Sequence, residues 1–585
     1  MINSCGVKKQ QYIDQPSMFD IFYIENNVKS KTIVDFGMQE VMPESFCFDK
    51  YTVQKYIDDI GKYGLNKVWS AILDYALTNN SSELLSIQNF GVLYEIGLAE
   101  QDKTNKKESG QYFTPDDVSS VMANWLKNLK GNNICDVGCG TGNLILAYLK
   151  QVGTNDAERL LSERKIYLYD NDSLALQIAQ YSIALTYGKE YLNSINLIYG
   201  DFLDKAVVLP KDAKVISNPP YAKITQIKPT WQKTENLLSS KDYYSAFIEK
   251  IVTSGCQAVV ISPYSFLGGN KYYSLRKVLN DYNGFIVSFD NVPGNIFNGK
   301  KHGIFNTNTA NSVRAAITVI ENTDDSRGFR TSHLVRFKTE ERENLLNNDI
   351  LESLLSENKQ IVSQGQPSYV KCHKELDNLF RIWTNKSNKQ LLDQLSKKEN
   401  EFALYVPNTC RYFTTASVTK LSRTGMITLY AKDEESYDFL YCLINSSFAY
   451  WHWRIFDGGI TYPVGLLNSI PVFVDLLLKE DKDFFSNMRK KMANLEKQYI
   501  VTKLNAGVEQ ENIKFPKSFR EEINSKFFKV LGCNDNPQLF DLVHSNAVFN
   551  TVIFNINSVR QLNPTIAGKV FFKGLKYLDI KNYYV

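Results

Sequence analysis

Four consecutive residues, Asn218, Pro219, Pro220 and Tyr221, are the first place in this chain where the residue types suggest chemistry. They follow the apolar run AKVI, which is typical of a core strand. Each proline removes a backbone N–H and fixes φ near about −65°, so the backbone has one rigid, extended shape. A stiff exit from the strand is one explanation. The alternative is that a polar side chain and an aromatic face have to be held still for a ligand.

A glycine-rich segment at residues 133–145, NICDVGCGTGNLI, has the pattern of a strand, a tight turn and the start of a helix. Gly138, Gly140 and Gly142 permit the turn and let a ligand approach the backbone. Asp136, at the end of the strand, can accept hydrogen bonds. The spacing is not the GxGxxG of dinucleotide-binding proteins, and a turn needed only for close packing would also use glycines.

Two further strands end in acidic residues. KIYLYD ends in Asp170, which is placed to bind a ribose diol or, alternatively, to cap a helix. INLIYGDF ends in Asp201 and Phe202, an acceptor beside an aromatic ring, which could bind the amino group of an adenine and cover its ring. An open α/β sheet binds its ligand at the carboxyl ends of its strands, so polar groups at four successive strand ends predict one ligand site.

The elements that position these residues are predicted from apolar periodicity. Residues 52–101 carry apolar side chains at helical spacing, and a polar linker follows them. From about residue 111 to 320, short apolar strands alternate with helical patterns, which predicts a doubly wound, mostly parallel, Rossmann-like α/β sheet. Beyond it the pattern is mixed α/β. We therefore expect a helical N-terminal domain at 1–108, a catalytic domain at 109–320 and a third domain at 321–585.

Composition narrows the class of protein. The 585 residues are 43% hydrophobic and 22% charged, and no apolar stretch approaches the ~20 residues of a membrane span. The N-terminus lacks the apolar core of a signal peptide, and the nine cysteines form no CxxC pair. These features predict a cytoplasmic protein with no membrane association and no bound metal. A net charge of +4 does not indicate a polyanionic partner, so any nucleic-acid surface has to be local.

The motifs GQYFTP (110–115), DVGCGTGN, YGDF and NPPY occur in a recognisable order. Over roughly residues 90–320 the chain resembles the S-adenosylmethionine-dependent DNA adenine N6-methyltransferases of the gamma class, the TaqI-like enzymes. DYYSAFIEKIV resembles the helix that follows their catalytic loop, and IFNGKK (296–301) resembles a later loop whose phenylalanine packs on the flipped base. NPPY alone also occurs in enzymes that methylate protein glutamine, RNA adenine or guanine.

The resemblance implies S-adenosyl-L-methionine as the cofactor. Its binding residues would be Tyr112, Thr114, Asp136, Gly138, Gly140, Asp170, Asp201 and Phe202. The catalytic loop would be Asn218, Pro219, Pro220 and Tyr221. Tyr221 would stack on the target base together with Phe297, or with Phe305 in a similar setting, and Lys300 would contact a DNA phosphate. An ordinary core phenylalanine and a solvated loop lysine are the alternative interpretations of Phe297 and Lys300.

The implied reaction is methylation of adenine N6 in double-stranded DNA after base flipping, in a type II restriction-modification system with a cognate restriction endonuclease. The segment LYEIGLAEQDKTNKKESGQYFTP, however, resembles the junction in type I modification subunits. A subunit of a type I-like complex is therefore an alternative. A protein-glutamine or RNA methyltransferase and a catalytically silent DNA-binding subunit are further alternatives.

The region after residue 320 is expected to recognise the DNA target. Residues 437–473 resemble segments of target-recognition domains in restriction-modification proteins. Three aromatic residues in it, Tyr450, Trp451 and Trp453, are expected to lie in the core more readily than on DNA. No acidic pair with a correctly spaced Glu-x-Lys follows a strand, so the sequence predicts no fused endonuclease.

Overall fold

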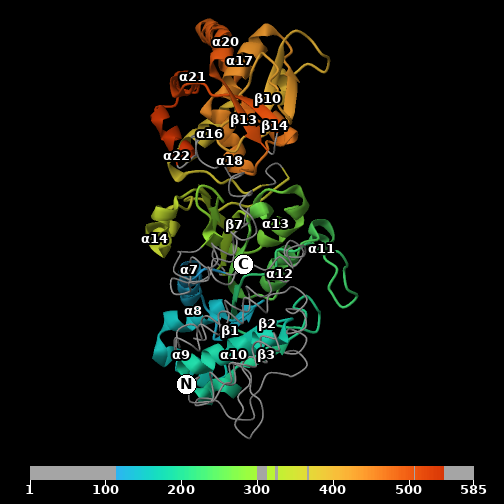
Figure 1. The fold of residues 1–585 in the computed structure, drawn as a ribbon, viewed down its shortest axis with the longest axis vertical. Coiled ribbons are helices and arrows are strands. Elements are labelled where there is room, and N and C mark those ends of the chain that lie inside the picture. The colour runs from blue at the N-terminus through green and yellow to red at the C-terminus, as the bar shows by residue number, and fades with distance from the viewer. Residues whose placement is uncertain (1–113, 299–312, 323–326, 365–367, 506–507, 546–585) are drawn as a thin grey trace, which may run out of the picture.

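The computed structural model describes residues 114–298, 313–322, 327–364, 368–505 and 508–545 (Figure 1). The expected helical domain at 1–108 lies outside these residues, and so do Tyr112, Lys300 and Phe305. Within the described residues no helix is long and apolar enough to cross a membrane. The same residues contain no group of three or more His, Cys, Asp and Glu side chains that could hold a metal ion.

An eight-stranded sheet forms the centre of the first half of the described chain, in the order β3-β2-β1-β4-β5-β7-β6-β8. The strands are β1 (Asn133–Val137), β2 (Ile166–Asp170), β3 (Asn196–Tyr199), β4 (Ala213–Ser217), β5 (Gln257–Pro263), β6 (Asn283–Phe289), β7 (Ala315–Ile320) and β8 (Gly328–Val335). Only β7 is antiparallel to its neighbours, β5 and β6, among these strands. The prediction of a doubly wound, mostly parallel sheet is confirmed.

Helices cover both faces of this sheet, because successive side chains of a strand point to opposite faces. In β1, Ile134 packs into one apolar cluster, whereas Cys135 and Val137 pack into another. The first cluster contains residues of α7 (Asp116–Asn128), α8 (Asn143–Val152), α9 (Thr154–Ser162) and α10 (Ser173–Tyr187). The second contains residues of α11 (Glu235–Ser240), α12 (Tyr243–Thr253) and α13 (Tyr273–Leu279).

The sheet extends past residue 320, where the sequence analysis placed the end of the catalytic domain. β8 pairs in parallel with β6 over its length. Its buried residues include Thr331 and Ser332, and the Ser332 hydroxyl accepts a hydrogen bond of 3.0 Å from the N–H of Ser288. Buried hydroxyl residues hide the apolar alternation of a strand, so the periodicity did not indicate β8. Two short helices follow, α14 (Arg342–Leu345) and α15 (Asn348–Ser353).

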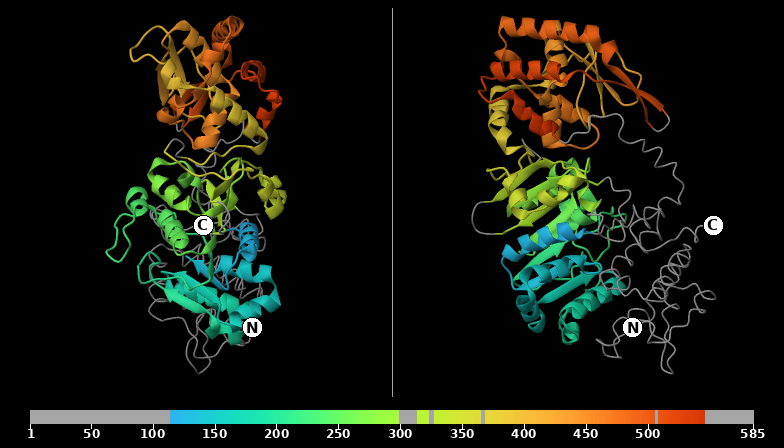
Figure 2. Two further views of the ribbon diagram at one scale, coloured as in Figure 1. Left: turned by 180° about the vertical axis from the view of Figure 1, so that it is seen from behind. Right: turned by 60° about the vertical axis from the view of Figure 1, so that its left-hand side comes forward.

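The remaining elements form a second, mixed α/β region, which lies at the other end of the long axis of the molecule (Figures 1 and 2). Its helices are α16 (Asp377–Lys386), α17 (Glu434–Asn445), α18 (Ser447–Phe456), α19 (Val464–Asn468), α20 (Lys479–Tyr499), α21 (Lys517–Val530) and α22 (Phe540–His544). Its strands pair two by two: β10 (Ala403–Pro407) with β11 (Met426–Tyr430), β12 (Pro471–Val472) with β9 (Lys389–Gln390), and β13 (Ile500–Asn505) with β14 (Val508–Ile513).

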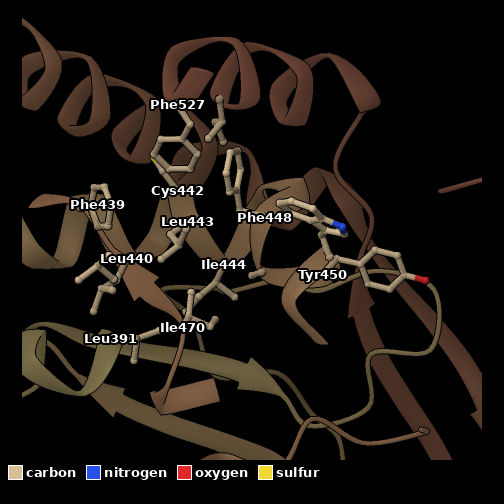
Figure 3. Close-up of a cluster of buried hydrophobic side chains, with 14 of the residues drawn as sticks. Leu391, Phe439, Leu440, Cys442, Leu443, Ile444, Phe448, Tyr450, Ile470 and Phe527 are labelled. Carbon is tan, nitrogen blue, oxygen red and sulfur yellow. The ribbon is translucent and has the colours of Figure 1, made fainter. Parts of the chain in front are cut away.

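The core of this second region is rich in aromatic side chains. Phe439 of α17 and Phe448 of α18 pack with Phe527 of α21, at ring-centroid distances of 5.7 and 5.4 Å (Figure 3). Tyr450, Trp451 and Trp453 are all buried. These three rings therefore belong to the core, as expected, and do not offer faces to DNA.

The two regions are joined by buried ion pairs on Asp290, which follows β6. Its carboxylate accepts hydrogen bonds from Arg314 Nε (2.8 Å), before β7, and from Arg336 Nε (2.8 Å), after β8. A third partner, Arg454 Nη1 (2.6 Å), comes from α18 of the second region. Arg454 also donates to the carbonyl of Leu334 at 2.8 Å. The second region thus contacts the sheet at the carboxyl ends of β6 and β8.

Candidate active site

The turn after β1 requires glycine. Gly138, Gly140 and Gly142 have φ values of 71°, 52° and 86°, in the left-handed region that other residues rarely adopt. A Cβ on Gly142 would lie 2.8 Å from the Cβ of Ala179 in α10, too close for any side chain. The N–H of Gly138 donates to the carbonyl of Tyr169 at 2.8 Å, which fastens the turn to the end of β2. The turn therefore brings its backbone against the neighbouring strand end.

Asp136, in β1 just before this turn, is completely buried. Its Oδ2 accepts a hydrogen bond of 3.1 Å from the N–H of Ile145 in α8, and its Oδ1 has no hydrogen-bond partner among the described residues. Burial, together with the nearby charge of Asp170, raises the pKa of Asp136 to about 8 despite that bond. The buried, unbonded Oδ1 is suited to accept a hydrogen bond from a cationic ligand when the carboxyl group is ionised.

Asp170, the last residue of β2, faces the same turn. Its Oδ2 accepts a hydrogen bond of 2.8 Å from the N–H of Gly140, and its Oδ1 accepts one of 3.0 Å from the N–H of Asp172. Burial raises the pKa of Asp170 to about 6, although these backbone bonds oppose the shift. Each carboxylate oxygen can accept a second hydrogen bond, so the two backbone bonds orient the group without using all of its capacity.

Asp201 follows β3 and already has three donors. Its Oδ1 accepts from the N–H of Leu203 at 3.0 Å. Its Oδ2 accepts from Lys228 Nζ at 2.6 Å and from Trp231 Nε1 at 3.1 Å. Lys228 and Trp231 lie in the segment after the NPPY motif, and no local pattern of residues indicates their contact with Asp201. Asp201 is thus positioned by a loop as well as by its own strand.

Phe202 is more buried than an adenine-covering residue would need to be. It is only 4% exposed, its ring lies 4.9 Å from that of Phe247, and Lys250 Nζ lies 4.8 Å from its centroid. The ring belongs to the apolar cluster under α12. Its expected contact with the cofactor stays a prediction.

Asn218 lies at the end of β4, beside the turn after β1. Its Nδ2 donates to Thr114 Oγ1 at 2.9 Å. The carbonyl of Thr114 accepts in turn from Asn143 Nδ2 at 2.5 Å, and β4 is tied to β1 by Ser217 Oγ donating to Val137 O at 2.6 Å. These bonds fix the amide plane of Asn218. Asn143, which the sequence analysis did not single out, directly follows the last glycine of the turn and holds Thr114.

The rings of Tyr221 and Phe297 lie close together, and their expected stacking on a target base stays a prediction. Their ring centroids are 6.0 Å apart at an interplanar angle of 68°, and Tyr244 of α12 lies 6.4 Å from Tyr221 on another side. The loop that carries Tyr221 is fastened to the start of α12, because Tyr243 N donates to Ala222 O at 3.2 Å. Phe297 is only 1% exposed. Two aromatic rings therefore stand beside the rigid loop of Asn218.

The arrangement defines a class of protein. The sheet order, the single reversed strand β7 and polar groups at the carboxyl ends of β1 to β4 are those of a Rossmann-like, S-adenosylmethionine-dependent methyltransferase domain. Residues 85–350 match the family described as N-6 DNA Methylase. The resemblance to adenine N6-methyltransferases of restriction-modification systems is thereby confirmed, and with it S-adenosyl-L-methionine as the cofactor.

Curated relatives match part of the chain. The type II methyltransferase M.BsuBI of Bacillus subtilis is 29% identical over 194 residues, which are 30% of this chain and 38% of that protein. The type I restriction enzyme MpnII methylase subunit of Mycoplasma pneumoniae is 26% identical over 239 residues, which are 36% of this chain and 42% of that protein. The chain therefore aligns with less than half the length of each of these two relatives.

Solved structures resemble the chain more distantly. A cryoEM structure of a DrdV–DNA complex covers 83% of this chain and 66% of its own, with 13% identity and a TM-score of 0.45. The M protein of the type I restriction enzyme EcoKI covers 64% of this chain and 80% of its own, with 16% identity and a TM-score of 0.31.

The residues present fit the cofactor. The ammonium, ribose and adenine amino groups of S-adenosyl-L-methionine are all hydrogen-bond donors, so their site needs acceptors. Asp136 Oδ1 is buried without a partner among the described residues, and Asp170 and Asp201 add two carboxylates at the next strand ends. The left-handed glycines leave the backbone between these acids open to close approach.

Proposed function

We propose that this protein is a site-specific DNA methyltransferase that flips an adenine out of the duplex and transfers a methyl group to its N6 atom. One observation carries the proposal. The side chain of Asn218, oriented by Thr114 and followed by two prolines and Tyr221, stands at the same sheet edge as the acids Asp136 and Asp170.

The rigid loop supplies acceptors to a poor nucleophile. The lone pair of an exocyclic adenine amine is delocalised into the ring, so N6 has to become more tetrahedral before it reacts. If the Asn218 side-chain oxygen and the Pro219 carbonyl both accept hydrogen bonds from N6, its lone pair turns out of the plane of the base. The cofactor, when bound, supplies a methyl group on a sulfonium. The methylated amine is acidic enough to lose its proton afterwards, so no strong general base is required.

The aromatic residues hold the extruded base. A base inside a duplex cannot reach the Asn218 loop, so the target has to be flipped out, as nucleobase-modifying enzymes generally require. Tyr221 offers a ring face to such a base, and Phe297 limits the space on the side where the two rings meet at 6.0 Å. Stacking on an aromatic side chain contributes about 1–3 kcal/mol per base, enough to offset part of the cost of unstacking.

The system to which the enzyme belongs is best described as type II, with double-stranded DNA and a cognate restriction endonuclease as partners. The curated relatives include one type II methyltransferase and one type I methylase subunit. We favour type II because the chain continues beyond the sheet into a second large region, which we propose recognises the DNA sequence. A modification subunit of a type I-like complex, which needs a separate specificity subunit, is the second candidate.

Single-molecule sequencing of DNA from cells that express the protein tests this proposal. N6-methyladenine should appear in one sequence context in cells with the wild-type protein and be absent in cells with Asn218→Ala at equal expression. Modification by the chain alone supports a type II enzyme. Modification only when a specificity subunit is expressed with it supports the type I-like alternative, and no modified adenine in either case contradicts the proposal.

A further inference from the structure

Arg342 of α14 holds the C-terminal end of the segment from Asp290 to Phe297. This arginine is 2% exposed. Its Nη1 donates to the carbonyl of Asn295 at 2.9 Å, and its Nη2 donates to the carbonyl of Ile296 at 2.7 Å. These are the two peptide groups that directly precede Phe297. Arg342 therefore fixes the backbone from which the Phe297 ring projects toward Tyr221.

The same guanidinium binds the helix on the cofactor side. Arg342 Nε lies 2.6 Å from Asp117 Oδ2, and Nη2 lies 2.8 Å from Asp117 Oδ1. Asp117 is in the first turn of α7, three residues after Thr114, whose hydroxyl accepts from Asn218. The buried Arg342 side chain thus links the segment that carries Phe297 to the segment that orients Asn218.

We propose that Arg342 is a positioning residue that sets Phe297, and through it the target base, relative to Asn218. The inference rests on the proposed function. Arg342 acts on the backbone of Asn295 and Ile296, through the hydrogen bonds to their carbonyls. Its absence would let the Phe297 ring move while the other contacts of the site remain.

Only arginine satisfies this geometry. The planar guanidinium of Arg342 donates four hydrogen bonds, two to backbone carbonyls and one to each oxygen of the Asp117 carboxylate. Lysine carries three donors on a single nitrogen and cannot span both partners in one plane. A lysine at position 342 keeps the positive charge beside Asp117 but loses the simultaneous contacts with both carbonyls.

The cofactor side does not depend on Arg342 in the same way. Thr114 is held independently, because its carbonyl accepts from Asn143 Nδ2 at 2.5 Å and from Ser119 Oγ at 3.3 Å. Near Phe297, the N–H of Phe297 donates to Asn295 Oδ1 at 2.9 Å, and the N–H of Gly294 donates to the carbonyl of Phe337 at 2.7 Å. A substitution at position 342 should therefore alter the position of the target base and affect cofactor binding much less.

Hydrogen exchange followed by mass spectrometry tests the backbone part of the proposal without any activity. In Arg342→Lys and Arg342→Gln, the amides of Gly294 and Phe297 should exchange on the order of 10-fold faster than in the wild type. Arg489→Gln is the matched control, since it removes an ion pair of 2.6 Å with Asp438 in the second region. It should leave these amides unchanged, and equal exchange in all four proteins overturns the inference.

The functional part uses two unmodified duplexes with the target sequence: one with adenine at the target position, for kinetics, and one with 2-aminopurine there, for fluorescence. Relative to the wild type, Arg342→Lys should lower kcat by about 10-fold or more and reduce the fluorescence that reports the flipped base, with the KM for S-adenosyl-L-methionine within about 3-fold. Asp117→Asn, which keeps both carbonyl bonds of Arg342, should have a smaller effect. Equal kcat, or a KM that changes as much as kcat, overturns the inference. A wild type without methyltransferase activity refutes the proposed function instead and leaves the exchange result standing.

Discussion

Two buried aspartates at the carboxyl edge of the same sheet have opposite surroundings. Asp136, in β1, is 0% exposed, and Asp290, after β6, is 1% exposed. Burial raises the pKa of Asp136 to about 8. Burial acts on Asp290 in the same direction, but Arg454, Arg314 and Arg336 together hold the pKa of that carboxyl well below its usual value.

The difference separates a carboxylate whose oxygens are bonded by arginines from one that keeps an oxygen for the ligand we propose. Asp290 is bonded by side chains from three parts of the chain, so it fixes the second region against the sheet. Asp136 has one bond, to the backbone N–H of Ile145, and an oxygen without a partner among the described residues. A buried polar atom left unbonded costs free energy, which supports our proposal that the cofactor bonds to this oxygen.

Asp290→Ala should produce the largest loss of stability. Three buried or nearly buried arginines would lose their counter-charge, and removal of one partner from a buried ion pair costs about 3–5 kcal/mol. Urea unfolding measures the loss. Asp438→Ala, which removes the partner of a single arginine, is the control and should cost less. A loss for Asp290→Ala no larger than that of the control would show that the cluster does not hold the two regions together.

Asp170→Ala should act on cofactor affinity instead. Loss of two hydrogen bonds to one carboxylate corresponds to about 2–4 kcal/mol, or roughly 30- to 1000-fold weaker binding of S-adenosyl-L-methionine. Isothermal titration calorimetry measures it. Asp290→Asn, if folded, should bind the cofactor with wild-type affinity. Unchanged affinity in a folded Asp170→Ala protein would remove Asp170 from the cofactor site.

The pH dependence of stability should reveal the proton on Asp136. Because the pKa of Asp136 rises from 3.8 to about 8 on folding, the folded state holds a proton that the unfolded state has lost between these values. Stability of the cofactor-free protein therefore falls as pH rises, by about 1.4 kcal/mol per pH unit from this group. From pH 6.0 to 7.5 the wild type should lose about 2 kcal/mol more than Asp136→Asn in urea unfolding. Parallel curves for the two proteins would contradict the raised pKa.

Tyr221→Phe should have the smallest effect. The hydroxyl donates a long hydrogen bond, 3.4 Å, to the carbonyl of Ile261, and loss of so long a bond should leave the methylation rate within about 3-fold. Tyr221→Ala removes the ring and should weaken base holding by about 1–3 kcal/mol, seen as lower 2-aminopurine fluorescence. If Tyr221→Phe is as inactive as Tyr221→Ala, the ring face is not what the reaction needs.

The parts of the site that are contiguous in sequence could be predicted, and the parts that depend on distant residues could not. Asp136, Asp170, Asp201 and Asn218 each lie at or just after the end of a strand with an apolar pattern. Periodicity therefore predicted most of the sheet and its polar edge, but not β8. The bonds of Lys228 to Asp201 and of Arg342 to Asp117 join residues 27 and 225 positions apart, and no local pattern marks either pair.

The same limit explains the interface between the two regions. Asp290 and Arg454 are 164 positions apart in sequence and meet because α18 packs against β8, the neighbour of β6. Arginine is exposed in most proteins, but Arg314, Arg336 and Arg454 are buried here because they share Asp290 as a partner. Residue type alone does not indicate this burial. The contact of Tyr221 with Phe297 was expected only through the resemblance to a known family.

Analysis of nucleosides by mass spectrometry tests the central claim most directly. Purified protein is incubated with S-adenosyl-L-methionine and unmodified DNA that contains the target sequence, and the DNA is then digested. We expect N6-methyladenine with the wild type and at least ~100-fold less with Asn218→Ala at equal cofactor affinity, the scale of losing one preorganised polar group at a reacting centre. No N6-methyladenine with the wild type, or the wild-type amount with Asn218→Ala, would contradict the account.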